Sequence, residues 1–170
     1  MRIRIRKMTE EEYLSFYRFS GQHHAEELVR EERLSPEEAK REAERELSEM
    51  LPNGLDTADN YLMVIENSAD GRRVGFIWFL FEIYQEKKQS FICDLMIEET
   101  ERRKGYAAAA LNEAERTAET NGCAESVLFV SNANIPARML YSKCGYVFLR
   151  NTGHGMYLVK KLKGEENENV

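Results

Sequence analysis

A basic, glycine-containing turn stands between an apolar segment and an alanine-rich one. Ile92–Ile97 is apolar, Glu98–Glu101 is acidic, and Arg102–Ala107 carries three cations, with Gly105 where a helix is expected to begin. Helix N-termini bind anions through free N–H groups and a partial positive charge, and glycine lets the backbone approach a ligand closely. The pattern predicts a pyrophosphate site, and a solvated basic turn ahead of a helix is the competing interpretation.

A second pattern lies downstream, where a strand and a short helix are expected. It reads Asn134-Ile-Pro-Ala-Arg-Met-Leu-Tyr141-Ser-Lys-Cys-Gly145-Tyr146. Tyr141 falls on the apolar face of this helix, where a lone tyrosine is more often a core residue. Asn134 is a helix cap, and capping is compatible with a ligand contact.

Together the two patterns resemble those of the GNAT superfamily of acyl-CoA N-acyltransferases. Arg102-x-x-Gly105-x-Ala107 matches that family's pyrophosphate-loop pattern, Gln/Arg-x-x-Gly-x-Gly/Ala. The family's downstream pattern, Asn-x-x-Ala-x-x-Leu-Tyr-x-x-x-Gly-Phe/Tyr, is matched by Asn134, Ala137, Leu140, Tyr141, Gly145 and Tyr146. The resemblance covers roughly Tyr61–Leu162, and both patterns in this order are more specific than either alone.

The resemblance implies direct transfer of an acyl group from acyl-CoA to an amine, without a covalent enzyme intermediate. It assigns the pantetheine arm to the backbone of Leu95, Met96 and Ile97, where an N–H would stabilise the thioester oxyanion. Tyr141 would protonate the leaving thiolate, because a thiol pKa of ~8.5 lies close to the ~10 of a phenol. Asn134 would contact the carrier near its thiol-bearing arm. The pyrophosphate is assigned to Arg102, Arg103, Lys104, Gly105, Tyr106 and Ala107.

The match departs from the family pattern at two loop positions and lacks an obvious general base. Glycine is frequent in the family where Arg103 and Ala107 stand, but neither replacement removes a backbone amide. Asp94, near the end of the apolar segment, is the candidate base. A structural or solvated aspartate is the competing interpretation, with water as the base.

His23, His24 and Glu27 are the candidate contacts for the acceptor amine. They lie near an expected break between two N-terminal helices, a region that covers the acceptor pocket in the family that the chain resembles. A surface turn is the alternative. The long Ala25–Met50 segment favours a pocket cover over the open groove that a protein-acetylating enzyme needs.

Hydrophobic periodicity and capping signals indicate an α/β (α+β) fold. We expect a mixed, mostly antiparallel sheet of six or seven strands with helices on both faces. Strands are expected at Arg2–Arg6, Tyr61–Glu66, Val74–Tyr84, Ser90–Ile97, Ser126–Val130, Tyr146–Arg150 and Met156–Leu162. Helices are expected from Thr9 to about Phe19, from Ser35 to Met50, from Gly105 to Asn121 and from Asn134 to Cys144. A polar turn is expected at Gln85–Gln89, and a helix break around Gly21–His24.

Length and composition limit the classes of protein further. The 170 residues predict one domain over 1–163 and an acidic, disordered tail over 164–170. The net charge of −6 argues against nucleic-acid and membrane partners. The three cysteines lack metal-ligand or disulfide spacing, so no metal is expected and reduced thiols favour a cytoplasmic protein. No signal peptide is visible.

These observations predict an enzyme that moves an acetyl group from acetyl-CoA to a primary amine of a small molecule or peptide. The enzyme would be a monomer or a homodimer. A CoA-binding regulatory domain without turnover and a protein-acetylating enzyme are the alternatives. A dinucleotide-binding oxidoreductase is disfavoured, because the Gly-x-Gly-x-x-Gly pattern is missing.

Overall fold

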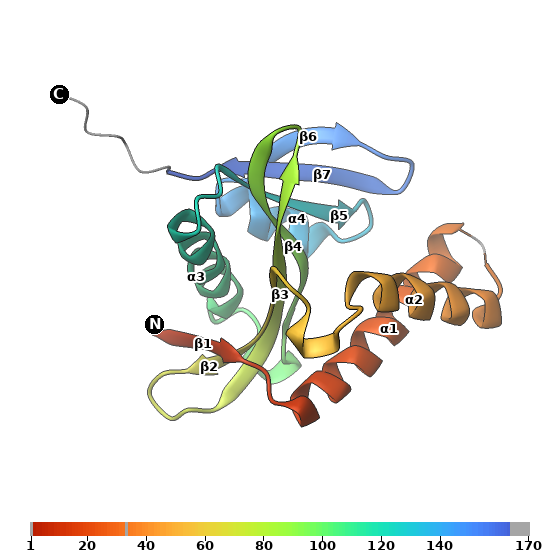
Figure 1. The fold of residues 1–170 in the computed structure, drawn as a ribbon, viewed down its shortest axis with the longest axis horizontal. Helices are drawn as coiled ribbons and strands as arrows, with labels where there is room; N and C mark the ends of the chain where they lie inside the picture. Colours follow the sequence, from red (N-terminus) through yellow and green to blue (C-terminus); the bar gives the residue numbers. More distant parts are fainter. Residues whose placement is uncertain (1, 33, 164–170) are drawn as a thin grey trace. The chain divides into compact units, whose positions relative to one another are not determined.

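The computed structural model describes residues 2–32 and 34–163, so the tail predicted over 164–170 lies outside the described residues. The strands are β1 (Ile3–Lys7), β2 (Asn60–Asn67), β3 (Arg73–Tyr84), β4 (Lys87–Ile97), β5 (Glu125–Ser131), β6 (Val147–Asn151) and β7 (Gly155–Lys161). The α-helices are α1 (Glu10–Glu32), α2 (Pro36–Met50), α3 (Tyr106–Thr120) and α4 (Ile135–Lys143), with short 3-10 helices η1 (Gly54–Asp56) and η2 (Glu99–Glu101). Figure 1 shows these elements in sequence colours.

The chain divides into two compact units. Of the described residues, 2–6 and 63–163 belong to one unit, and 7–32 and 34–62 belong to the other. The single domain predicted over 1–163 stays a prediction.

The seven strands form one sheet in the order β1-β2-β3-β4-β5-β7-β6. β4 and β5 run parallel, whereas the pairs β3–β4, β5–β7 and β6–β7 run antiparallel. The predicted mixed, mostly antiparallel sheet is therefore confirmed. The predicted turn at Gln85–Gln89 is shorter than expected: Gln85 and Glu86 both have positive φ, as two-residue hairpin turns of type I′ require, and β4 begins at Lys87.

The centre of the larger unit is built from β3 and the apolar face of α3. Ile77 and Phe79 are fully buried in β3, and α3 packs against β3 and β4 (Figure 1). Ala110, Leu111, Ala114 and Ala118 are fully buried on one face of α3, as their helical spacing predicts. This packing fixes the N-terminus of α3 at the end of β4.

In the smaller unit, α1 and α2 pack side by side (Figure 1). Ser35 caps α2, which begins at Pro36 as predicted, and the Ser35 and Glu38 side chains form a capping box there. The predicted break at Gly21–His24 is wrong, because α1 continues from Glu10 to Glu32. Leu28, which follows the expected break, is buried in a cluster with Ala39 and Ala43 of α2. That apolar contact offsets the helix cost of an interior glycine, about 1 kcal/mol.

Candidate functional site

β4 and β5 lose their pairing halfway along their length. They pair from Gln89–Ile92 against Glu125–Leu128, while β4 continues to Ile97 and β5 to Ser131. Cys93 is an extra residue on β4, since Trp78 pairs with Asp94 and Phe79 with Ile92, and such bulges bend a strand. Within the described chain, the β5-facing edge of residues 95–97 has no strand partner. An extended ligand arm can add to an edge of this kind as a strand does.

The turn after β4 has the backbone of an anion site. Gly105 precedes α3 with φ 86° and ψ 3°, a left-handed conformation that glycine adopts without strain. A Cβ there would meet no atom within 4 Å, so the space beside the helix N-terminus is open. Arg103 also has a positive φ, 60°, which costs a non-glycine residue roughly 1–2 kcal/mol. Turns with left-handed residues gather N–H groups into concave anion sites.

The three cations of the turn have different surroundings. The Nε atom of Arg102 donates to the carbonyl oxygen of Ile97 at 3.1 Å, which ties the turn to the end of β4. Lys104 Nζ lies 3.2 Å from Glu101 Oε2. Arg103 is exposed and has no side-chain partner among the described residues. It is therefore the cation most available to an anionic ligand.

The next two loop residues turn toward the protein. The Tyr106 side chain is buried, and its hydroxyl accepts a hydrogen bond from Asn67 Nδ2 at 2.9 Å. Ala107 is half-buried on α3. At these two positions only the backbone amides remain as candidate pyrophosphate contacts.

Helix α4 has an incompletely covered inner face. Asn134 caps it as predicted, with Oδ1 accepting from the Ala137 amide at 3.2 Å. No residue of α4 is fully buried: Ala137, Leu140 and Tyr141 on the predicted inner face are half-buried. This face can therefore still accept a contact.

The Tyr141 hydroxyl is predicted to be a proton donor, and its surroundings keep it protonated. Its hydroxyl has no hydrogen-bond partner within the described chain. Burial first, and then the charges of Asp94 and Cys144, raise the pKa of Tyr141 to about 12, so the phenol is protonated at neutral pH. The influence of Asp94 on this pKa also means that the predicted acid and the predicted base lie in one region of the larger unit.

The Tyr141 ring packs against Tyr146, whose hydroxyl is paired with that of Ser126. The Tyr146 ring meets the Tyr141 ring edge-on, with centroids 6.0 Å apart and planes at 63°. Tyr146 is buried, and its hydroxyl lies 2.8 Å from Ser126 Oγ on β5. The Tyr146 amide also donates to the Tyr141 carbonyl at 3.0 Å. The end of α4 is thus fastened to β5.

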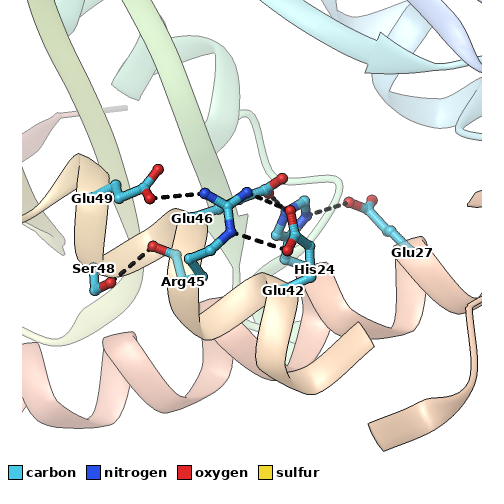
Figure 2. Close-up of polar contacts among 7 residues, drawn as sticks. All are labelled: His24, Glu27, Glu42, Arg45, Glu46, Ser48 and Glu49. Carbon is cyan, nitrogen blue, oxygen red and sulfur yellow. Dashed lines mark hydrogen bonds and ion pairs between the residues drawn. The ribbon is translucent and has the colours of Figure 1, made fainter. Parts of the chain in front are cut away.

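The candidate acceptor residues lie together on α1 in the smaller unit. They were expected near a turn, but the structure places His23, His24 and Glu27 inside a continuous helix. Nδ1 of His23 and Nδ1 of His24 lie 3.8 Å and 3.9 Å from the Glu27 carboxylate. His24 Nε2 also makes a hydrogen bond to Glu46 of α2 (Figure 2). His24 therefore links the two helices, beside the Arg45 ion pairs to Glu42 and Glu49.

This linkage predicts that the stability of the smaller unit depends on pH. Glu27 first, and then Glu46, raise the pKa of His24 from 6.5 to about 9, although burial lowers it. A raised folded-state pKa stabilises fully below about pH 6.5, and this contribution is lost as the pH rises through about 9. The side chains are more than a third exposed, so we expect about 0.2–1 kcal/mol. Urea unfolding of wild type and His24→Gln at pH 6 and pH 10 measures it: the difference in unfolding free energy should shrink at pH 10, and equal differences would refute the linkage.

Two features of the site were missed from the sequence. Glu101 was predicted only to belong to a charged loop, but it is buried between the cations of Arg72 and Lys104. Its spacing of three residues from Lys104 was the available signal. Gly75, on β3 opposite Ile97 of β4, was not singled out, because a lone glycine in a strand does not reveal which neighbour lies close.

None of the helices between residues 2 and 163 combines the length and apolarity that crossing a membrane requires. In the same part of the chain, no three or more His, Cys, Asp and Glu side chains are grouped so as to hold a metal ion.

Comparison with protein families and curated proteins gives consistent matches. The family model for the acetyltransferase (GNAT) family matches residues 11–146. YycN of Bacillus subtilis, which is named as an N-acetyltransferase, is 32% identical over 147 residues, or 86% of this chain and 93% of that protein. YdgE of the same organism, named likewise, is 32% identical over 146 residues, or 86% of this chain and 92% of that protein.

Solved structures give the same result for the fold. The crystal structure of YycN from Bacillus subtilis has a TM-score of 0.81 at 29% identity, and the match covers 89% of this chain and 96% of that one. The PaiA N-acetyltransferase of Thermoplasma acidophilum, solved in complex with coenzyme A, has a TM-score of 0.67 at 22% identity. That match covers 95% of this chain and 99% of that one.

Proposed function

The chain belongs to the GNAT family of acetyltransferases, and we propose that it transfers an acetyl group from acetyl-CoA to a primary amine of a small molecule or a peptide. The observation that carries this proposal is the β5-facing edge of β4 at residues 95–97, which has no strand partner among the described residues and leads to the turn of residues 102–107, here called the anion turn. The coenzyme A bound to the Thermoplasma protein supports the choice of carrier.

The proposed contacts follow the order of the groups along coenzyme A. The backbone of Leu95, Met96 and Ile97 holds the pantetheine arm, and one of its N–H groups polarises the thioester carbonyl. Asn134 contacts the carrier near its thiol-bearing arm. The pyrophosphate rests on the amides of 103–107 and on the Arg103 guanidinium. Each contact uses a group that the fold leaves accessible on the β4 edge, the turn or α4.

The proposed reaction is a direct displacement at the thioester. The amine nitrogen bonds to the acyl carbon and gives a proton to Asp94 or to water, while the C–S bond breaks and the sulfur takes the Tyr141 proton. The pKa of Tyr141, about 12, lies above the ~8.5 of a thiol in water. Burial beside the same side chains would also raise the pKa of the coenzyme A thiol. The difference between this pKa and that of Tyr141 would therefore be smaller than in water.

The acceptor contacts remain a prediction. His23, His24 and Glu27 form one cluster on α1, and the exposed imidazole of His23 is the most accessible of the three. If His23 contacts the amine, His23→Ala should raise the KM for the amine more than that for acetyl-CoA. Unchanged KM values for both substrates would exclude this contact.

The proposed function can be tested by measuring the release of free CoA thiol from acetyl-CoA. The acceptors are a panel of primary amines and amino-terminal peptides. We expect amine-dependent release with at least one small amine or short peptide. If acetyl-CoA binds but no amine or peptide gives turnover, the protein is a CoA-binding domain without this activity. Turnover with whole proteins alone would indicate a protein-acetylating enzyme.

Carrier binding can be tested at Gly105. Saturation at ~100 times the dissociation constant adds ~2.7 kcal/mol of stability, or about 5–11 °C in Tm for a chain of this size. A leucine side chain at position 105 would fill the open space beside the helix N-terminus, so Gly105→Leu should lose most of this shift in a thermal unfolding assay.

Gly122 supplies a matched control at the other end of α3. It too is left-handed, with φ 81°, and a Cβ there also meets nothing within 4 Å. Gly122→Leu should therefore show the same backbone strain but keep the CoA-dependent shift. Equal CoA-dependent shifts in Gly105→Leu and Gly122→Leu would show that coenzyme A does not bind at the 102–107 turn.

A further inference from the structure

Glu101 is a buried acid inside a turn assigned to an anion. Only 4% of its side chain is exposed, although it lies between exposed residues of an acidic and basic segment. One carboxylate oxygen contacts Arg72 Nη1, and the other lies 3.2 Å from Lys104 Nζ. Burying a carboxylate is unfavourable unless it is paired, and here two cations pair with it.

The two cations come from different parts of the sheet. Arg72 lies in the turn between β2 and β3, and Lys104 belongs to the anion turn. A second ion pair, Arg73 with Glu98 at 2.8 Å, joins the same two segments at an exposed position. The Glu101 amide also donates to the Glu98 carbonyl at 2.8 Å. The anion turn is thus fastened to the β2–β3 turn through one buried carboxylate.

We propose that Glu101 is a positioning residue: it anchors the 102–107 turn to Arg72, so that the turn's amides are already arranged when the pyrophosphate of coenzyme A binds. This inference rests on the proposed carrier site. Preorganisation of a binding loop strengthens affinity because less conformational freedom is lost on binding. The left-handed backbone at Arg103 and Gly105 is the conformation that such an anchor would hold.

The anchoring role and simple electrostatics predict opposite changes in the affinity for coenzyme A when Glu101 is replaced by glutamine. Glu101→Gln removes a negative charge beside an anion site, so electrostatics alone predicts tighter CoA binding. If the carboxylate anchors the turn, the same change frees Arg72 and Lys104 and weakens binding. Glu99→Gln is the matched control, since Glu99 belongs to the same short helix and is exposed.

Calorimetric titration of wild type and both variants with coenzyme A measures whether the Kd rises or falls. We expect the Kd of Glu101→Gln to rise about tenfold and that of Glu99→Gln to change less than twofold. The KM for acetyl-CoA should rise in Glu101→Gln while kcat stays close to wild type, because the anchor does not touch the reacting atoms. An unchanged or lower Kd for Glu101→Gln would overturn the proposal.

Amide hydrogen exchange without ligand provides a second measurement. Exchange at residues 102–107 should accelerate in Glu101→Gln and also in Arg72→Gln. Arg72→Gln removes the other partner of the same ion pair. It therefore tests the anchor even if Glu101→Gln does not fold. Unchanged exchange in a folded Arg72→Gln protein would overturn the anchor. Failure of wild type to bind coenzyme A would refute the carrier site instead, while the exchange result still decides whether the anchor exists.

Discussion

Gly75→Ala should lower the unfolding temperature by roughly 6–12 °C and weaken coenzyme A binding at the same time. An alanine Cβ at this position would lie 2.1 Å from the carbonyl oxygen of Met96, well inside van der Waals contact. The opposing atom belongs to the backbone of β4, so no side-chain rotation can relieve the overlap. Overpacking of this kind costs about 3 kcal/mol, and each kcal/mol corresponds to ~2–4 °C in a domain of this size.

The effect on binding follows from the position of the overlap. Met96 lies in the part of β4 that is proposed to hold the pantetheine arm, and Gly75 pairs with Ile97 beside it. To accept a methyl group, β4 must move away from β3, which displaces the backbone groups on its unpaired edge. We therefore expect a reduced CoA-dependent thermal shift in whatever fraction of the variant remains folded.

Gly153→Ala is the control for Gly75→Ala. A Cβ at Gly153 meets nothing within 4 Å, and its φ lies outside the left-handed region, so Tm should stay within about 1–2 °C of wild type. Thermal unfolding with and without coenzyme A measures all three proteins. If Gly75→Ala retained the wild-type Tm, the two strands could not approach as closely as described.

Much of the fold could be predicted because its signals are local. Ser35 and Glu38 form a capping box, Pro36 stands at the first helical position, and α2 begins where these residues predict. The Gly105 position could be identified because a turn into a helix N-terminus requires a left-handed residue or an open approach, and glycine provides both. Signals of this kind depend on neighbours in sequence, not on tertiary contacts.

The errors arose where a distant contact decides the conformation. Gly21 and the polar residues after it have the composition of a helix break, yet α1 is continuous. Gln22 bonds to Glu26 at 3.2 Å within the helix, and His24 reaches Glu46 on the neighbouring helix. These contacts, with burial of Leu28 against α2, outweigh a single unfavourable glycine. The contacts of His24 and Leu28 with α2 depend on the packing of the two helices, which the sequence does not reveal.

The detailed shape of the candidate site was also beyond reach from the sequence. The bulge at Cys93 depends on how β3 and β4 align, and strand registers are set by the whole hairpin. Arg103 has a left-handed φ, a conformation for which arginine carries no signal. Glu101 resembles its charged neighbours in composition, and only the position of Arg72 explains its burial.

Tyr141→Phe should lower kcat by about 10²–10⁴-fold, the usual range for loss of general acid catalysis. Without the hydroxyl, coenzyme A must leave as a thiolate in a partly dry site, and an unpaired buried charge is unfavourable. The pKa of about 12 keeps the donor protonated over the whole neutral range, so kcat should not fall through ionisation of Tyr141 below about pH 10. Steady-state kinetics with the best amine measures this change.

The same substitution should leave folding and carrier affinity almost unchanged. The Tyr141 hydroxyl has no hydrogen-bond partner among the described residues, and its ring contact with Tyr146 is retained by phenylalanine. We therefore expect a Tm within about 1–2 °C of wild type and a similar Kd for acetyl-CoA, because the hydroxyl matters only as charge develops on sulfur. Tyr84→Phe, which deletes an exposed hydroxyl in the β3–β4 hairpin, should leave kcat unaltered. If a folded Tyr141→Phe protein turned over at the wild-type rate, water or another group would have to be the acid; if it lost stability instead, Tyr141 would be a structural residue of α4.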